Sequence, residues 1–96
     1  MEQPWWIDHQ ARDLAAIGLT ESALQKLGRL RFVDLALVGT QLKTNDSLAT
    51  IEGQQMITDL KSPIDGVIVA VNPALKGWVA ADVDNGQWLI KVQPFS

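Results

Sequence analysis

Hydrophobic positions near the start of the chain form two short runs separated by a polar stretch. Residues 5–7 (Trp-Trp-Ile) follow Pro4 and favour extended backbone, so they predict a first strand. The polar residues 8–13 predict a turn. Residues 14–18 are apolar again, and their pattern leaves two readings open. They either pair with the first strand or, because alanine favours helices, begin a helix.

The next segment, residues 20–28, has the spacing of a helix. Thr20 can serve as the N-cap, because its hydroxyl can accept a hydrogen bond from an amide of the first turn. Gly28 can adopt the left-handed conformation that ends a helix. Such a helix has only about two turns, so we expect it to pack against a sheet. The apolar residues on one face are Leu19, Ala23, Leu24 and Leu27.

From residue 30 onwards the hydrophobic period shortens towards two, which is typical of strands. Asn45 is expected at a positive φ in a turn, a conformation that asparagine tolerates better than most residues. Further turns are indicated at Asn72-Pro73 and at residues 84–86. The expected strands cover residues 30–37, 49–52, 56–60, 67–71 and 87–92, with a strand-turn-strand unit over residues 38–48.

Composition narrows the class of protein. Ninety-six residues suit a single domain spanning residues 1–96, and 47% hydrophobic with 20% charged residues is ordinary for a globular protein. The chain has no cysteine, which excludes a disulfide framework and a cysteine nucleophile. It starts without a secretory signal pattern and has no apolar run of the roughly 18 residues that span a bilayer. With a net charge of −3 and scattered basic residues, we expect a cytoplasmic protein that binds neither membrane nor nucleic acid.

Residues 51–66 carry the most informative motif. This stretch resembles the modified hairpin of the glycine-cleavage H protein, in which a lysine stands three residues after a glutamate and carries lipoate in amide linkage. Here the lysine position holds Gln55. The residues that match the family pattern around it are Glu52, Asp59, Pro63 and Gly66.

The resemblance extends over most of the chain, through residues 17–28, 31–39 and 88–92. It implies a mainly β fold, the barrel-sandwich hybrid of lipoyl-type domains. Such a fold would have two small antiparallel sheets, one short helix and a peripheral N-terminal hairpin. The resemblance favours a strand for residues 14–18. It also places Gln54 and Gln55 at an exposed hairpin tip.

The missing lysine changes the expected chemistry. Glutamine has no nucleophilic amine, so we expect no lipoylation and no cofactor as the chain stands, with lipoate only if the acceptor lysine were present. Lys43 and Lys61 are the nearest lysines in sequence, and Lys61 lies up to roughly 20 Å along an extended strand. The resemblance implies that Glu52, Gln54 and Asp59 serve recognition by partner proteins.

Two departures from the family pattern lie beside the tip. Gly53 is expected to loosen it, and Met56 replaces a small residue directly after the acceptor position. The alternative for the two glutamines is a solvated turn without a role.

Other candidate sites are weaker. Glu52 and Asp59 flank the tip and could approach each other across the strands as an acid/base pair, although a solvated acidic rim is the favoured interpretation. His9 is the only histidine, and the serines therefore lack a plausible triad. Asp8, Asp82 and Asp84 would form only a weak site for a hard cation. Of the adjacent Trp5 and Trp6, one is expected to lie outside, because neighbouring strand residues point to opposite faces.

We therefore predict an H-protein-like domain that acts as a non-catalytic protein-binding module. Its partners would be proteins, such as glycine-cleavage or lipoate-transfer enzymes. Three alternatives remain. The chain could be a lipoyl carrier of the glycine cleavage system, or of a related lipoate-relay pathway, with Gln55 as a substituted lysine. It could be a biotin-type carrier relative, for which Met56 alone is faint support. A small enzyme is the third, and no constellation of residues supports it.

Overall fold

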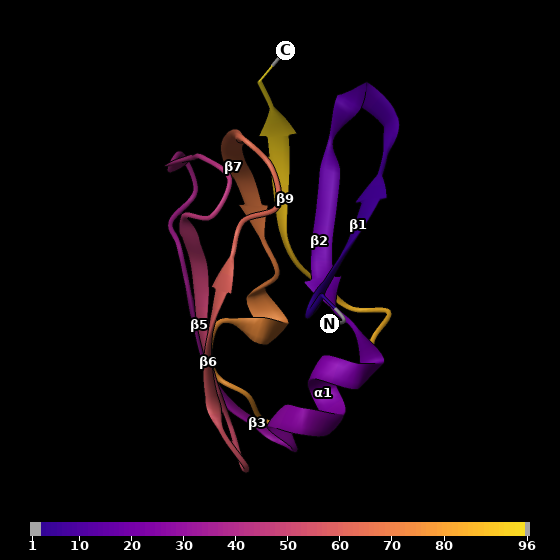
Figure 1. The fold of residues 1–96 in the computed structure, drawn as a ribbon, viewed down its shortest axis with the longest axis vertical. Helices are drawn as coiled ribbons and strands as arrows, with labels where there is room; N and C mark the ends of the chain where they lie inside the picture. The colour runs from indigo at the N-terminus through magenta and orange to yellow at the C-terminus, as the bar shows by residue number, and fades with distance from the viewer. Residues whose placement is uncertain (1–2, 96) are drawn as a thin grey trace.

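Two antiparallel sheets face each other in this computed structural model, which describes residues 3–95 (Figure 1). The five-stranded sheet has the order β1 (Trp5–His9), β2 (Ala15–Leu19), β9 (Trp88–Pro94), β7 (Gly66–Val71) and β4 (Gln41–Leu42). The four-stranded sheet has the order β6 (Ile57–Lys61), β5 (Ser47–Gly53), β3 (Leu30–Leu35) and β8 (Gly77–Trp78). The helical elements are α1 (Glu21–Leu27) and two 3-10 helices, η1 (Ala11–Asp13) and η2 (Pro73–Leu75). The predicted barrel-sandwich hybrid is confirmed.

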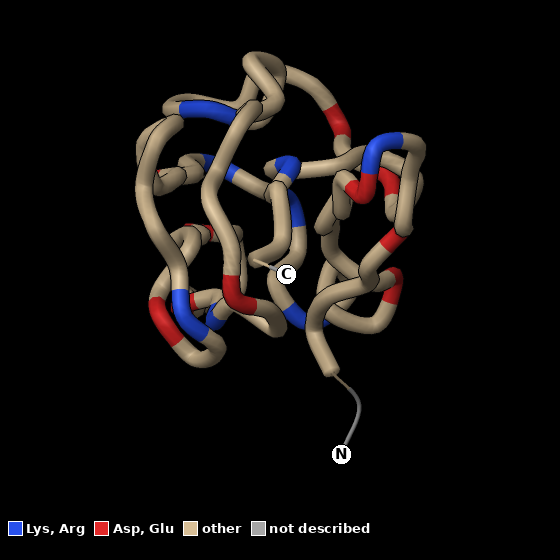
Figure 2. The backbone as a smooth tube through the Cα atoms, turned by 90° about the horizontal axis from the view of Figure 1, so that it is seen from above, with Lys and Arg blue, Asp and Glu red and all other residues tan. Residues whose placement is uncertain are grey.

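The core lies between the sheets. Strands of the four-stranded sheet contribute fully buried side chains such as Val33 and Ile51, and the five-stranded sheet contributes Ile17, Ile68 and Ile90. In β3 the buried Val33 and Leu35 flank the exposed Asp34, which is the period of two of a strand. The alternation breaks at the start of the strand, where the register shifts between Leu30 and Phe32. Basic and acidic positions are mixed along the backbone (Figure 2).

Helix α1 follows its sequence signals closely. Thr20 Oγ1 accepts a hydrogen bond from the Ala23 amide at 3.2 Å. Gly28 has φ +73, and its amide donates to Leu24 O at 3.0 Å. No helix within residues 3–95 combines the length and the apolar character needed to cross a membrane.

The N-terminal hairpin is not peripheral, and this part of the prediction is wrong. Strand β2 lies between β1 and β9, and all five of its residues are buried. Ala15, Ala16 and Gly18 are small, so both faces of β2 can be covered at close range. The predicted turn also begins two residues too early, because β1 continues to His9, which pairs with Ala15. Residues 14–18 do form a strand rather than a helix, except for Leu14.

The adjacent tryptophans are both half-buried, so the expectation that one lies outside is also wrong. Trp5 packs against the core. Trp6 packs against Gly18, where an added Cβ would sit 2.3 Å from the indole ring. The missing side chain at Gly18 therefore provides the space that Trp6 fills.

The turns agree with the sequence, whereas one short strand was missed. Asn45 has φ +77, as expected. Asn72 caps η2 by accepting from the Ala74 amide at 3.1 Å. Strand β8 spans only two residues, and no period is visible over so short a length.

Candidate functional site

Gln54 and Gln55 join β5 to β6 at an exposed hairpin tip, as the sequence predicts. The strands pair with Glu52 opposite Ile57, and the Gly53 amide donates to Met56 O at 2.9 Å. The two strands with alternating apolar and polar residues therefore pair with each other, and the polar residues between them form the tip. It lies at the lower end of the molecule in Figure 1, at the same end as α1.

The backbone of the tip is attached to the end of α1. The Gln55 amide donates to Leu27 O at 2.9 Å, and the Gln54 amide donates to Arg29 O at 2.8 Å. The last carbonyls of a helix have no partner within the helix, so an outside donor stabilises them. The hairpin supplies that donor here, and the tip and the helix end form one unit.

The Gln55 side chain extends the same attachment. With its amide oriented to donate, Nε2 lies 3.0 Å from Lys26 O and 3.3 Å from Gln25 O. Its Cγ lies 3.0 Å from the position that a Cβ on Gly28 would take. The side chain therefore lies across the helix end and caps it, with a glycine beneath.

Gly53 does not loosen the tip, which corrects the expectation from the sequence. It is buried, and an added Cβ would lie 2.3 Å from Leu27 O and 2.9 Å from Leu27 Cβ. Real side chains do not approach a backbone oxygen so closely. Glycine at this position is what allows the hairpin to reach the helix.

Glu52 and Asp59 do not face each other across the strands. Glu52 pairs with Ile57 and Asp59 with Thr50, so the two acids are diagonal neighbours on one face. Asp59 instead accepts hydrogen bonds from Lys61 Nζ, at 2.6 Å, and from Ser47 Oγ. These two donors hold the pKa of the Asp59 carboxyl below its ordinary value of 3.8. A carboxylate kept ionised in this way suits a polar rim better than an acid/base pair.

Closeness in the sequence does not decide which lysine lies at the tip. Lys61 pairs with Ser47, at the end of the hairpin away from the tip, as expected. Lys26 is the lysine brought to the tip, because α1 docks there, and it lines a small hollow together with Met56. The helical pattern predicts that α1 packs on a sheet, but no local signal says where, so the sequence does not reveal this neighbour.

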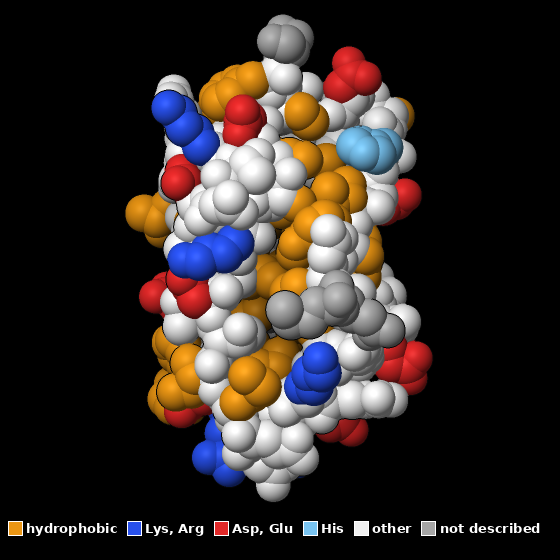
Figure 3. Space-filling model, in the orientation of Figure 1, with side chains coloured by type: hydrophobic (Ala, Val, Ile, Leu, Met, Phe, Trp, Pro, Cys, Tyr) orange, Lys and Arg blue, Asp and Glu red, His pale blue; other side chains and the backbone are white. Residues whose placement is uncertain are grey.

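The remaining candidates do not assemble into sites. Within residues 3–95 no three His, Cys, Asp or Glu side chains are grouped to hold a metal ion, so Asp8, Asp82 and Asp84 do not form the weak site considered above. His9 is exposed on β1. Hydrophobic side chains reach the surface over much of the face in Figure 3, and at the tip Met56 and Ile57 are exposed.

Comparisons with known proteins point to one family. Residues 1–96 match a family described as glycine cleavage H-protein. The glycine cleavage system H protein of Aeromonas salmonicida is 37% identical over 91 residues, which cover 92% of this chain and 70% of the relative. That of Prosthecochloris aestuarii is 41% identical over 83 residues, covering 81% of this chain and 63% of the relative. The chain thus spans about two thirds of their length.

A solved structure gives the same result. The crystal structure of a glycine cleavage system H protein from Mycobacterium marinum matches with a TM-score of 0.77 at 28% identity. The match covers 98% of this chain and 80% of that protein.

Proposed function

The chain belongs to the glycine cleavage H-protein family, a family of carriers rather than catalysts, and we propose that this member acts as a protein-binding module without lipoate. The observation that carries the proposal is the state of Gln55. Its side chain has no amine, and its amide is already engaged as the cap of α1.

The position does not fit the cofactor that the family resemblance implies. Attachment of lipoate requires a neutral amine that attacks an activated carboxyl group. The nitrogen of a carboxamide is not such a nucleophile, because its lone pair is delocalised into the carbonyl. Gln55 Nε2 also donates to Lys26 O and Gln25 O, so it points back onto the helix.

What the tip offers instead is a fixed and partly apolar surface. Met56 is 45% exposed and Ile57 is 64% exposed, directly beside Gln54 and Gln55. Glu52 and Asp59 lie on the same face of the hairpin as Ile57 and add a polar rim. Because the backbone of the tip is anchored to α1, a partner would bind it without first ordering a loop. We infer that Glu52, Gln54 and Asp59 contact a partner protein.

A lipoyl carrier with Gln55 in place of lysine is the second candidate. The preserved hairpin favours it, since Glu52 and Asp59 flank an exposed tip in a chain of this family. In that case the partners would be glycine-cleavage or lipoate-transfer enzymes.

Intact mass tests whether the chain carries lipoate with glutamine at position 55. We expect incubation with a lipoate ligase and lipoyl-adenylate to leave the mass of the chain unchanged. Gln55→Lys, treated in the same way, is the positive control and is expected to gain lipoate at least in part. A lipoyl increment on the unchanged chain, mapped by peptide analysis to Lys26, Lys43 or Lys61, would contradict the proposal.

Crosslinking tests the binding surface. A photoreactive amino acid at Met56 is expected to capture a partner protein in the native host, which mass spectrometry then identifies. The matched control is Leu37, an exposed apolar residue at 71% that follows β3 at the end away from the tip. Equal capture at both positions, or none at Met56, would argue against a partner surface at the tip.

A further inference from the structure

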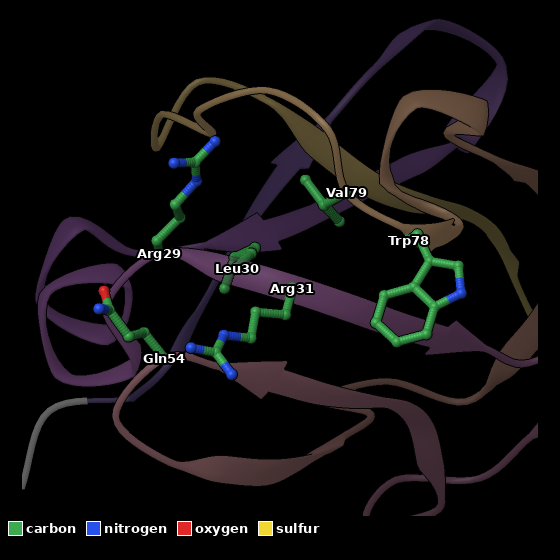
Figure 4. A pocket seen from close by; sticks show the side chains of 6 residues that line it. All are labelled: Arg29, Leu30, Arg31, Gln54, Trp78 and Val79. Carbon is green, nitrogen blue, oxygen red and sulfur yellow. The ribbon is translucent and has the colours of Figure 1, made fainter.

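A hollow of about 470 Å³ opens beside the hairpin tip, and the family resemblance does not account for it. Figure 4 shows its lining from Arg29, Leu30, Arg31, Gln54, Trp78 and Val79. The elements that form it are the start of β3, the edge strand β8 and the tip itself. Pairing continues past β8, since the Val79 amide donates to Arg31 O at 2.9 Å, and this bond fixes one wall.

Trp78 gives the hollow an exposed aromatic wall. Its side chain is 78% exposed, the largest value among the exposed large hydrophobic residues of the described chain. The indole does not hang free, because it stands edge-on to Phe32 with ring centroids 5.0 Å apart and planes at 74°. Tryptophan is one of the residue types enriched among the residues that contribute most to binding at protein interfaces. The floor beside it includes the buried Leu30.

The hollow is basic although the chain carries a net charge of −3. Arg29 pairs with Asp82 at 3.9 Å, and both side chains are well exposed, so this ion pair is weak. Arg31 forms no ion pair with any residue in the range 3–95. In Figure 4 Arg31 extends toward Gln54, with the Trp78 ring at the other end of the hollow, whereas Arg29 points away. Arg31 is therefore the cation best placed to receive an anion.

We propose that this hollow binds an acidic segment of a partner protein. A glutamate or aspartate carboxylate pairs with the Arg31 guanidinium, whose fork of donors matches a carboxylate. An apolar neighbour in the same segment packs on Trp78. The inference rests on the proposed function, because Gln54 belongs both to the hollow and to the tip surface, and it adds the chemistry of the partner. Two arginines on an acidic chain are too few for a phosphate backbone, so a nucleic acid is the less favoured occupant.

The test is an NMR titration of the full chain with the blocked peptide acetyl-Glu-Glu-Leu-Glu-Glu-amide. We expect shifts at the Trp78 indole, at Arg31 Nε and at the neighbouring amides, and no comparable shifts with the peptide in which glutamine replaces each glutamate. Binding should weaken as salt rises from about 20 mM to about 200 mM, since the pair is exposed to solvent.

Variants locate the effect. Arg31→Gln is expected to raise the Kd about five-fold or more, and Trp78→Ala to raise it similarly. Arg12→Gln is the matched control, because it removes the same charge from an exposed position in η1 and should bind as the unchanged chain does. Circular dichroism confirms that each variant is folded. Should Trp78→Ala unfold, Arg31→Gln decides alone.

Several outcomes would overturn the proposal. These are equal binding of the glutamine peptide, equal Kd values for Arg31→Gln and Arg12→Gln, or shifts that map away from the hollow. Stronger shifts of the same signals by a short single-stranded oligonucleotide would assign the hollow to nucleic acid. If the peptide does not bind, the proposed function can still be supported by crosslinking at Met56. A lipoyl increment on the unchanged chain would instead refute the proposed function, whether or not the peptide binds.

Discussion

At the scale of single residues, the Gln55 side chain caps a helix although it has no amine that could accept lipoate. Its amide caps α1 through Lys26 O and Gln25 O, and its backbone amide donates to Leu27 O. The sequence predicts the exposure of this residue but not the cap. The helix end that it contacts is nearly thirty residues earlier in the chain, so only the tertiary fold brings the two together.

Removing the cap is expected to cost a measurable amount of stability. Gln55→Ala keeps the backbone bond but loses the side-chain donor, so the free energy of unfolding should fall by about 0.5–1.5 kcal/mol. Gln55→Lys should stay within about 0.5 kcal/mol, because an ammonium can also donate to the last carbonyls of a helix. Urea denaturation measures both. Gln54→Ala is the matched control, and an equal loss there would show that Gln55 has no special role.

Gly53 gives a sharper prediction. A methyl group at this position would lie 2.3 Å from Leu27 O, so Gly53→Ala must push the hairpin away from α1. We expect a loss of about 1–3 kcal/mol in the free energy of unfolding, as for other overpacked sites. Gly86→Ala is the control, because its Cβ would meet only the Asp84 carboxylate, at 3.2 Å, and a side chain can move. A Gly53→Ala protein as stable as the control would mean that the hairpin does not pack on α1 as described.

At the scale of elements, the sequence predicts best where one residue type determines the conformation. The Thr20 cap and the Asn45 turn follow from local chemistry, and both occur. Prediction from the sequence fails where the position of an element depends on residues far away in the chain. Strand β2 is an inner strand because β9, about seventy residues later in the sequence, pairs with it, and no local pattern predicts that pairing.

The turn before β5 and the turn before β7 are joined by one carboxylate. Asp65 accepts from the Thr44 amide at 2.6 Å and from Thr44 Oγ1 at 2.9 Å, and these bonds, the backbone one foremost, lower the pKa of Asp65 below 3.8. A carboxyl group whose pKa is lower in the folded state stabilises the fold above its unfolded pKa. This contribution is lost as pH falls through the folded value.

The free energy of unfolding should therefore decline as pH drops below about 4, and Asp59 contributes to this decline in the same direction. Asp65→Asn should be less stable at neutral pH and should show a shallower decline. Chemical denaturation over a pH series measures both. Asp34→Asn removes an equal charge from an exposed position on β3. A slope as steep in Asp65→Asn as in that variant would contradict the assignment.

At the scale of the whole molecule, the core joins both sheets, and we propose that residues 1–96 fold as one domain. Ile17 of the N-terminal hairpin belongs to the same buried cluster as Leu60 and Ile90. The family resemblance predicts the two sheets and their helix. It places the hairpin at the periphery, and that error concerns the part of the fold on which the five-stranded sheet depends.

Deleting the hairpin tests this view. A chain that begins at Thr20 loses β1 and β2, and β9 is left with an unpaired edge and an uncovered core face. We expect this truncated chain to be unfolded by circular dichroism. The full chain should unfold in one transition, with coincident tryptophan fluorescence and circular dichroism curves. A folded truncated chain would restore the peripheral interpretation.

The attachment of the hairpin tip to the end of α1 has a consequence for inheritance. A lysine and a glutamine at position 55 can both donate to the helix carbonyls, so exchanging them changes reactivity and leaves the fold nearly unaffected. Selection on folding alone would not detect the exchange. A lineage that lost the acceptor lysine in this way would thus have kept a folded protein, on which selection for a different function could act at once.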